Sequence, residues 1–346
     1  MRPRPRFSIR QLPTSWAFQL LATGLFAFLA VWRVDLSQVA NALQGANYLW
    51  AVAAVVFSTS TKFIDTVRWR VYLAKVGHPP LLGLFGAFLI GNLGNNLLPM
   101  RVGDMAKIQI VANRYGLSRA GLASSVFVVE SVMDGVTFLI LLVGGLAFLD
   151  VGFVPPGLLW SLAVMAGGGF LATMAVSHLF PRTPPRWRWL GRLPPRLQDG
   201  LREGWSRFLD GMETMRDKAL LAQAVALNFA GWFSHVVVFW LFGLAFGLDL
   251  SLASYIVIMV AANLVSAFPI TFQNIGTYEF VLLEVMAAWG VERGEALAYA
   301  AATHLLTNLW IILVGITALW LMRVHPREVF GLRPAMGGSL SEGRRS

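Results

Sequence analysis

A stretch of polar and charged residues from Gly91 to Asp134 lies between segments that are apolar enough to cross a membrane. Lipid offers no hydrogen-bond partner, so a polar group at membrane depth is costly unless it faces protein or a water-filled cavity. The stretch nevertheless holds Asn92, Asn95, Asn96, Arg101, Asp104, Lys107, Glu130 and Asp134. We therefore predict that it is the working part of a membrane transporter.

The composition supports a membrane protein. Hydrophobic residues make up 56% of the 346 residues and charged residues only 13%, whereas soluble domains carry about 25% charged residues. The chain has no cysteine, which excludes disulfides and thiolate metal sites. The net charge of +10 comes from residues that flank apolar spans. There they set topology and contact lipid headgroups, so we expect membrane lipids as partners and no nucleic acid.

Hydrophobic runs predict an all-α polytopic membrane protein with about eight apolar helical elements, namely about six spans and two helical hairpins. The spans are expected at residues 15–32, 47–62 (with an extension to 73 left open), 120–148, 157–180, 219–248 and 296–322, and the hairpins at 81–115 and 252–289. Basic tails are expected at 1–14 and 323–346. A basic loop at 181–217 is expected to carry an amphipathic helix over 197–215.

Positive charge predicts the topology. Lys62, Arg68 and Arg70 follow the apolar part of the second span, and arginines fill the first tail, the 181–217 loop and the last tail. We therefore place both termini and these segments in the cytoplasm, and the 33–47 loop outside. The segment 81–115 must then enter the membrane and return to the same side. It is predicted to be a hairpin with its tip at 99–103.

The two halves of the chain repeat one plan with opposite orientation, residues 15–149 against 157–322. Counted from Gly116 and Gly290, Glu130 matches His304 and Asp134 matches Asn308. Both pairs are spaced i, i+4 and share one helix face. Inverted repeats with broken helices are typical of secondary transporters.

Arg101 at the first hairpin tip, with Lys107 further along, is predicted to bind a phosphate or carboxylate near a helix N-terminus. The alternative is an ion pair between Arg101 and Asp104 that closes the hairpin, and the two can coexist. Glu130 and Asp134 predict either a proton or cation site or a polar seam bonded to hairpin amides.

Other candidate substrate-binding residues lie on or near the hairpins. Glu279 mirrors the charges of the first hairpin, and His304 and Asn308 are the repeat counterparts of the two carboxylates. The alternative for each of these three residues is a purely structural contact between helices. The asparagines at 92, 95 and 96 are expected chiefly to hydrogen-bond backbone groups that are left unpaired where the hairpin interrupts its helix. No P-loop, HExxH or GxSxG motif occurs, so no catalytic residue, cofactor or metal site is predicted.

The run Asn95–Asp104, with Lys107, Gly116-Leu117-Ser118, Glu130 and Asp134, resembles the lysylphosphatidylglycerol synthase transmembrane region, also called the flippase-like domain family. Residues 268–279 with Gly290-Val291 resemble its second motif, and the resemblance covers about residues 15–325. It implies a bacterial or archaeal inner-membrane protein that moves lipids between leaflets. It also implies that Arg101, Asp104, Lys107, Glu130, Asp134 and Glu279 occupy motif positions.

Two departures qualify the resemblance. Glu130 is followed by Ser131 where the family often has arginine, which removes an internal charge partner, and Gln273–Gly276 replaces a more glycine-rich turn. Residues 323–346 are too few for the aminoacyl-transfer domain of some members, so synthase activity is not expected.

These features predict a transporter of an anionic or glycosylated lipid whose headgroup passes along a polar crevice between the hairpins. One alternative is a small-solute or ion transporter. Another is a non-transporting partner that docks lipid-biosynthesis enzymes through the segment 182–215.

Overall fold

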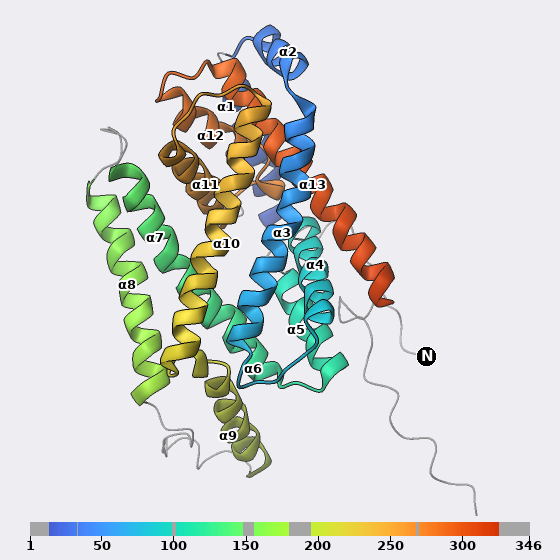
Figure 1. Cartoon of the computed structure of the whole chain (residues 1–346), viewed down its shortest axis with the longest axis vertical. Coiled ribbons are helices and arrows are strands. Elements are labelled where there is room, and N and C mark those ends of the chain that lie inside the picture. The colour runs from blue at the N-terminus through green and yellow to red at the C-terminus, as the bar shows by residue number, and fades with distance from the viewer. Residues whose placement is uncertain are drawn as a thin grey trace, which may run out of the picture.

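The computed structural model describes residues 14–32, 34–98, 102–147, 156–179, 195–267 and 270–324 (Figure 1). Over these residues the chain forms helices joined by turns and contains no strand, which confirms the all-α prediction for this part of the chain. The first half contains α1 (Thr14–Val31), α2 (Leu36–Gly45), α3 (Tyr48–Tyr72), α4 (Leu81–Leu97), α5 (Val102–Tyr115), α6 (Arg119–Ser124), the π-helical turn η2 (Ser125–Glu130) and α7 (Ser131–Ala147). The second half contains α8 (Pro156–Leu179), α9 (Pro195–Asp210), η4 (Glu213–Met215), α10 (Lys218–Ala245), α11 (Leu252–Ala267), η5 (Phe272–Asn274), α12 (Thr277–Ala287) and α13 (Arg293–Met322).

Helices α3 and α10 form a central antiparallel pair that packs along its whole length (Figure 1). At one end the Asn47 backbone N–H donates to the Ala245 carbonyl over 2.7 Å. At the other end the Thr214 hydroxyl, just before α10, donates to the Val71 carbonyl over 3.3 Å. The other helices pack around this pair.

Helices α4 and α5 form the predicted first hairpin. Glycines let the two arms touch, because a Cβ at Gly103 would overlap the Gly91 carbonyl oxygen. At the end of the hairpin away from its tip, Val76 before α4 and Leu117 after α5 pack against the same hydrophobic core. The arms of 17 and 14 residues are each shorter than the roughly 30 Å hydrocarbon core at 1.5 Å per residue, as in a re-entrant hairpin.

Helices α11 and α12 form the second hairpin, and η5 lies at its tip. Gln273 and Asn274 adopt left-handed backbone conformations with φ of 50° and 60°, which are strained for residues other than glycine. Gly276 follows with φ of 85°, and a Cβ there would collide with the α1 backbone at Phe26 and Ala27. Glycine is therefore required where the tip meets α1. Phe268 and Pro269 of the second motif lie outside the described residues.

Three of the described helical segments are long and apolar enough to cross a membrane: Arg119–Leu146, Lys218–Ala245 and Arg293–Met322. Helices α1 and α2, bent by 81°, together provide a fourth candidate. Helix α3 has 25 residues but carries four charged side chains, Lys62, Asp65, Arg68 and Arg70. The span count, the inverted repeat and the domain boundaries stay predictions. Helix α13 packs on α4 as α7 packs on α11, which is the packing that a repeat predicts.

Two local expectations differ from the structure, while the sidedness of these segments stays a prediction. The 33–47 loop contains α2, which begins after Asp35, whose carboxylate accepts from the Ser37 N–H over 2.8 Å. Lys62 and Arg68, read as charges at a cytoplasmic end, instead lie within α3, and Arg68 is only 3% exposed. Lys62 pairs with Asp65 of its own helix, and Arg68 pairs with Asp65 and also with Glu130 and Asp134 across the helix interface, so neither cation lies in a loop.

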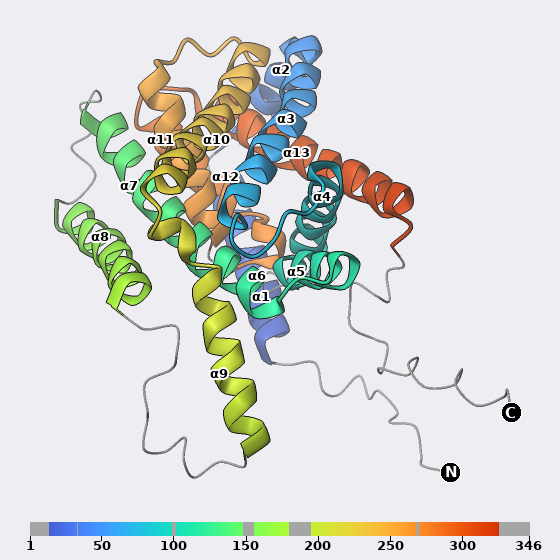
Figure 2. The same ribbon diagram turned by 60° about the horizontal axis from the view of Figure 1, so that its bottom comes forward.

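The amphipathic helix expected over 197–215 corresponds to α9 and η4. It packs against α6 and buries Leu209 and Met212 in the core. Figure 2 shows α9 extending from the end of the molecule that α5 and α6 form. The part of the basic loop at 180–194 lies outside the described residues.

Candidate functional site

Arg68 on α3 is the centre of a buried group of charges. Its Nη1 lies 2.8 Å from Asp134 Oδ1 and donates to Asn228 Oδ1, and its Nη2 lies 3.3 Å from Glu130 Oε1. A buried charge is stable only when it is paired and hydrogen-bonded. The planar guanidinium meets this need by serving α7 and α10 at once.

Lys107 on α5 extends the group toward the first hairpin. Its Nζ lies 3.2 Å from Asp104 Oδ1 and 3.3 Å from Glu130 Oε2. The same ammonium lies 5.2 Å from the Trp69 ring centroid and 4.9 Å from that of Phe88, within the range of cation–π attraction. Glu130 thus bridges Arg68 and Lys107.

Asp65 connects the group to a histidine. It lies 3.8 Å from Arg68, 3.8 Å from Lys62 and 3.4 Å from His235 Nε2. We call the seven charged residues together the charged cluster: Lys62, Asp65, Arg68, Asp104, Lys107, Glu130 and Asp134. The cluster contains one more carboxylate than cations, and a protonated His235 would balance it.

The backbone of η2 positions Glu130. Residues 125–130 form a π-helical turn, a feature often found at functional sites because it rotates the following side chains. The Trp69 indole donates to Ser125 Oγ over 3.1 Å and holds this turn against α3. On α10, Asn228 and Trp232 are spaced i, i+4, and Trp232 Nε1 donates to Asp134 over 2.8 Å.

The Trp232→Phe variant is expected to lose about 1–3 kcal/mol of unfolding free energy, because a hydrogen bond to a buried carboxylate disappears. Its ring contact with Phe138, with centroids 4.1 Å apart, should survive. Trp240→Phe is the matched control, since Trp240 lies on the same helix and is 41% exposed. Denaturant unfolding in detergent measures both variants. Equal stability of the two would contradict the importance of the indole N–H.

The two hairpin tips meet at a second polar group, which we call the tip cluster: Asn96, Gln273, Glu279, His304 and Asn308. The Gln273 side chain donates to the Asn96 carbonyl over 2.7 Å, and the Asn96 side chain donates to Asn308. Glu279 accepts from the Gly276 N–H over 2.7 Å and lies 2.6 Å from His304 Nδ1. The hydrogen bond between Gln273 and Asn96 therefore joins the two hairpins, although these residues lie 177 positions apart in the chain.

The structure divides the predicted site residues between these groups. Asp104, Lys107, Glu130 and Asp134 lie in the charged cluster, and Asn95 joins it by donating to Asp104 over 3.2 Å. The tip cluster contains the predicted Asn96, Glu279, His304 and Asn308. Among the described residues, the Asn92 side chain donates to the Phe88 carbonyl one turn back in α4, over 2.9 Å. Arg101 lies outside the described residues, and Asp104 pairs with Lys107.

Sequence reasoning did not find Arg68, Asp65, Asn228, Trp232 or His235 as site residues. A signal for α3 was present: Ser58, Thr61, Asp65 and Arg68 follow helical spacing. All four are buried. Arg68 also supplies the partner of Glu130 that Ser131 was expected to remove.

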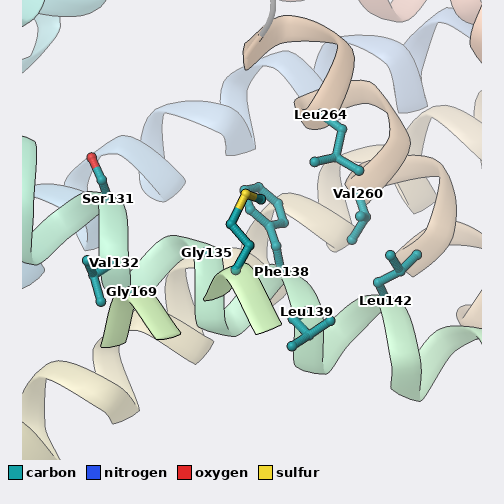
Figure 3. Close-up of a pocket in the computed structure, with 10 residues that line it drawn as sticks. Ser131, Val132, Gly135, Phe138, Leu139, Leu142, Gly169, Val260 and Leu264 are labelled. Atoms are coloured by element: carbon teal, nitrogen blue, oxygen red, sulfur yellow. The ribbon is translucent and has the colours of Figure 1, made fainter. Parts of the chain in front are cut away.

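An apolar cavity of about 260 Å³ lies beside the charged cluster, between α7, α8 and α11 (Figure 3). Several buried polar atoms have no partner among the described residues, including the amide oxygens of Asn95, Asn96 and Asn274. No group of three or more His, Asp or Glu side chains suited to a metal ion occurs in the described part of the chain.

The chain is similar to known membrane proteins. Residues 16–315 match the family described as the lysylphosphatidylglycerol synthase TM region. A UPF0104 membrane protein of Methanothermobacter thermautotrophicus is 21% identical over 316 residues, which cover 87% of this chain and 94% of that protein. The glycosyltransferase AglD of Haloferax volcanii is 26% identical, over 88% of this chain and 54% of AglD, so this chain spans about half the length of AglD. The match over most of its length shows that this multi-pass membrane protein belongs to the lysylphosphatidylglycerol synthase TM region family.

Proposed function

We propose that this protein moves a membrane lipid between leaflets, with the headgroup passing between the hairpin tips and along the charged cluster. One observation carries the proposal: Lys107, whose side chain is 5% exposed, is held between Asp104 and Glu130 within helices of a membrane protein. Ionised groups at membrane depth mark substrate or ion pathways by default. The proposal assigns no catalytic reaction to the chain.

The exposure of the charges favours a headgroup with hydroxyl donors. The side chains of Glu130 and Asp134 are 15% and 22% exposed, whereas that of Arg68 is 4% exposed. Lys62 of the same cluster is 19% exposed, so a headgroup that reaches these side chains meets two carboxylates and one cation, which leaves acceptors in excess. The unpartnered amide oxygens of Asn95, Asn96 and Asn274 also accept hydrogen bonds. Of an anionic and a glycosylated lipid, these acceptors favour the glycosylated one, and the name of AglD is in keeping with this choice.

Arg68 and Lys107 supply positive charge for the phosphate of such a lipid. A phosphate oxygen can replace a carboxylate oxygen on Arg68 in the same forked geometry. The Arg68–Glu130 and Lys107–Glu130 contacts would then be exchanged for contacts with the substrate rather than lost. Arg101 stays a predicted anion-binding residue at the entrance to this route.

Leaflet transfer in proteoliposomes tests the proposal. The purified protein should move a fluorescent glycosylated phospholipid faster than protein-free vesicles do. Glu130→Gln should slow transfer about tenfold or more, since it weakens charge-assisted hydrogen bonds. Glu284→Gln makes the same chemical change on a carboxylate whose side chain is 44% exposed, and it should leave the rate unchanged. Equal rates for both variants and the wild type would contradict the proposal.

A small-solute or ion transporter is the second candidate, because the charged cluster has a carboxylate in excess and could take up a cation. This candidate predicts an electrogenic ion flux into lipid-tight vesicles without any lipid transfer. Measuring both fluxes on the same proteoliposomes distinguishes the two functions.

A further inference from the structure

The cavity between α7, α8 and α11 has the shape and lining of a hydrocarbon site. Figure 3 shows Leu139 and Leu142 of α7 on the side of Val260 and Leu264 of α11, and Val132 of α7 on the side of Gly169 of α8. Ser131 is the one hydroxyl-bearing side chain among the lining residues. The cavity is open on one side, and an apolar lining of this kind favours nonpolar molecules over water.

Lipid is the neighbour of this cavity on its outer side. On α8, Val164 is 71% exposed, and Met165, which itself lines the cavity, is 67% exposed. On α7, Ile140 and Val143 are 49% and 47% exposed. In a multi-pass membrane protein such side chains face acyl chains, so a lipid tail has a short path into the cavity. Its volume of about 260 Å³ is below the roughly 300–1,000 Å³ of typical small-molecule sites. It therefore suits one chain, not a headgroup.

The cavity also adjoins the charged cluster. Its lining residues Ser131 and Gly135 are the chain neighbours of Glu130 and Asp134. Phe138, another lining residue, contacts Trp232, whose indole donates to Asp134. A lipid with its headgroup at these carboxylates would place a tail at the cavity mouth.

We propose that this cavity binds one hydrocarbon chain of a membrane lipid, and so anchors the lipid while its headgroup occupies the charged cluster. The binding stands on the cavity alone, and its part in transfer rests on the proposed function. Gly135 and Gly169 are open positions in the wall, because a Cβ at either meets no atom within 4 Å. Leucine at these positions fills the cavity without disturbing the backbone.

Photolabelling tests the proposal on the full chain. The probe is a phospholipid with a diazirine on one acyl chain, in vesicles of phosphatidylcholine and phosphatidylglycerol. Mass spectrometry should place label on the cavity residues of α7, α8 and α11. Gly135→Leu and Gly169→Leu should each lower this labelling about tenfold, since a leucine displaces about two buried methylene groups of the chain.

Gly144→Leu and Gly168→Leu are the matched controls. They lie on the same two helices, a Cβ at either also meets nothing within 4 Å, and neither lines the cavity. The controls should label like the wild type. Label spread evenly over the exposed apolar faces, unchanged by the filling variants, would overturn the proposal. Cavity labelling without leaflet transfer by the wild type would uphold the site and refute the proposed function.

Discussion

Replacement of Arg68 by methionine is expected to stop leaflet transfer and to lower the free energy of unfolding by about 3–5 kcal/mol. The guanidinium is the common partner of Asp134, Glu130 and Asn228. Its loss leaves two buried carboxylates with fewer positive neighbours, and an uncompensated buried charge is costlier than the pair it replaces. Denaturant unfolding and the transfer assay measure the two effects separately.

Three further variants separate the charge of Arg68 from its size. Arg70→Met should change stability by no more than about 0.5 kcal/mol, because Arg70 is exposed on the same helix. Arg68→Lys should recover only part of the stability, since one ammonium replaces a fork of donors. Combining Arg68→Met with Asp134→Asn should be more stable than Arg68→Met alone. A double variant as unstable as the sum of both changes would argue against a charge effect.

Gly103→Ala is expected to cost about 1–3 kcal/mol of stability, and Gly103→Val more, because added atoms overpack the contact between α4 and α5. A Cβ at Gly103 would overlap the Gly91 carbonyl oxygen and the Asn95 backbone nitrogen. Pushing the arms apart would also pull Asp104 and Lys107 away from their partners. Lipid transfer should therefore fall together with stability.

Gly144→Ala is the control for the hairpin variant. Gly144 lies inside α7 with open space around it, so alanine should stabilise the protein by about 0.5–1 kcal/mol through helix propensity. Unfolding of both variants in the same detergent gives the comparison. A neutral Gly103→Ala would show that the arms of the first hairpin do not need this close contact.

The hairpins could be predicted from the sequence because topology and glycine content agree there. The distribution of basic residues predicts that 81–115 returns to its own side, a sidedness that stays a prediction. Gly91, Gly94 and Gly103 allow the close approach of the two arms that the structure shows. The helix α2 was missed because its ten residues are too few for a span. Asp35 just before the helix is a residue type that is typical of a helix N-cap, so the start of α2 could have been predicted.

The centre of the site was harder to predict. Arg68 follows an apolar run, and nothing local distinguishes a buried arginine from one at a cytoplasmic end. Its burial depends on Glu130 of η2, Asp134 of α7 and Asn228 of α10, which are 62, 66 and 160 residues away. The repeat alignment paired Glu130 with His304, yet the two residues belong to different clusters. Glu130 contacts Arg68 of α3 and Lys107 of α5, whereas His304 contacts Glu279 of α12.

Crosslinking of the two hairpin tips tests the central claim most directly. The chain has no cysteine, so Asn96→Cys and Gln273→Cys introduce one unique thiol pair where the tips touch. A short, cleavable thiol crosslinker should stop leaflet transfer in the double variant, cleavage should restore it, and each single variant should be unaffected by the reagent. Transfer at the uncrosslinked rate while the tips are covalently joined would contradict a headgroup route between the hairpins.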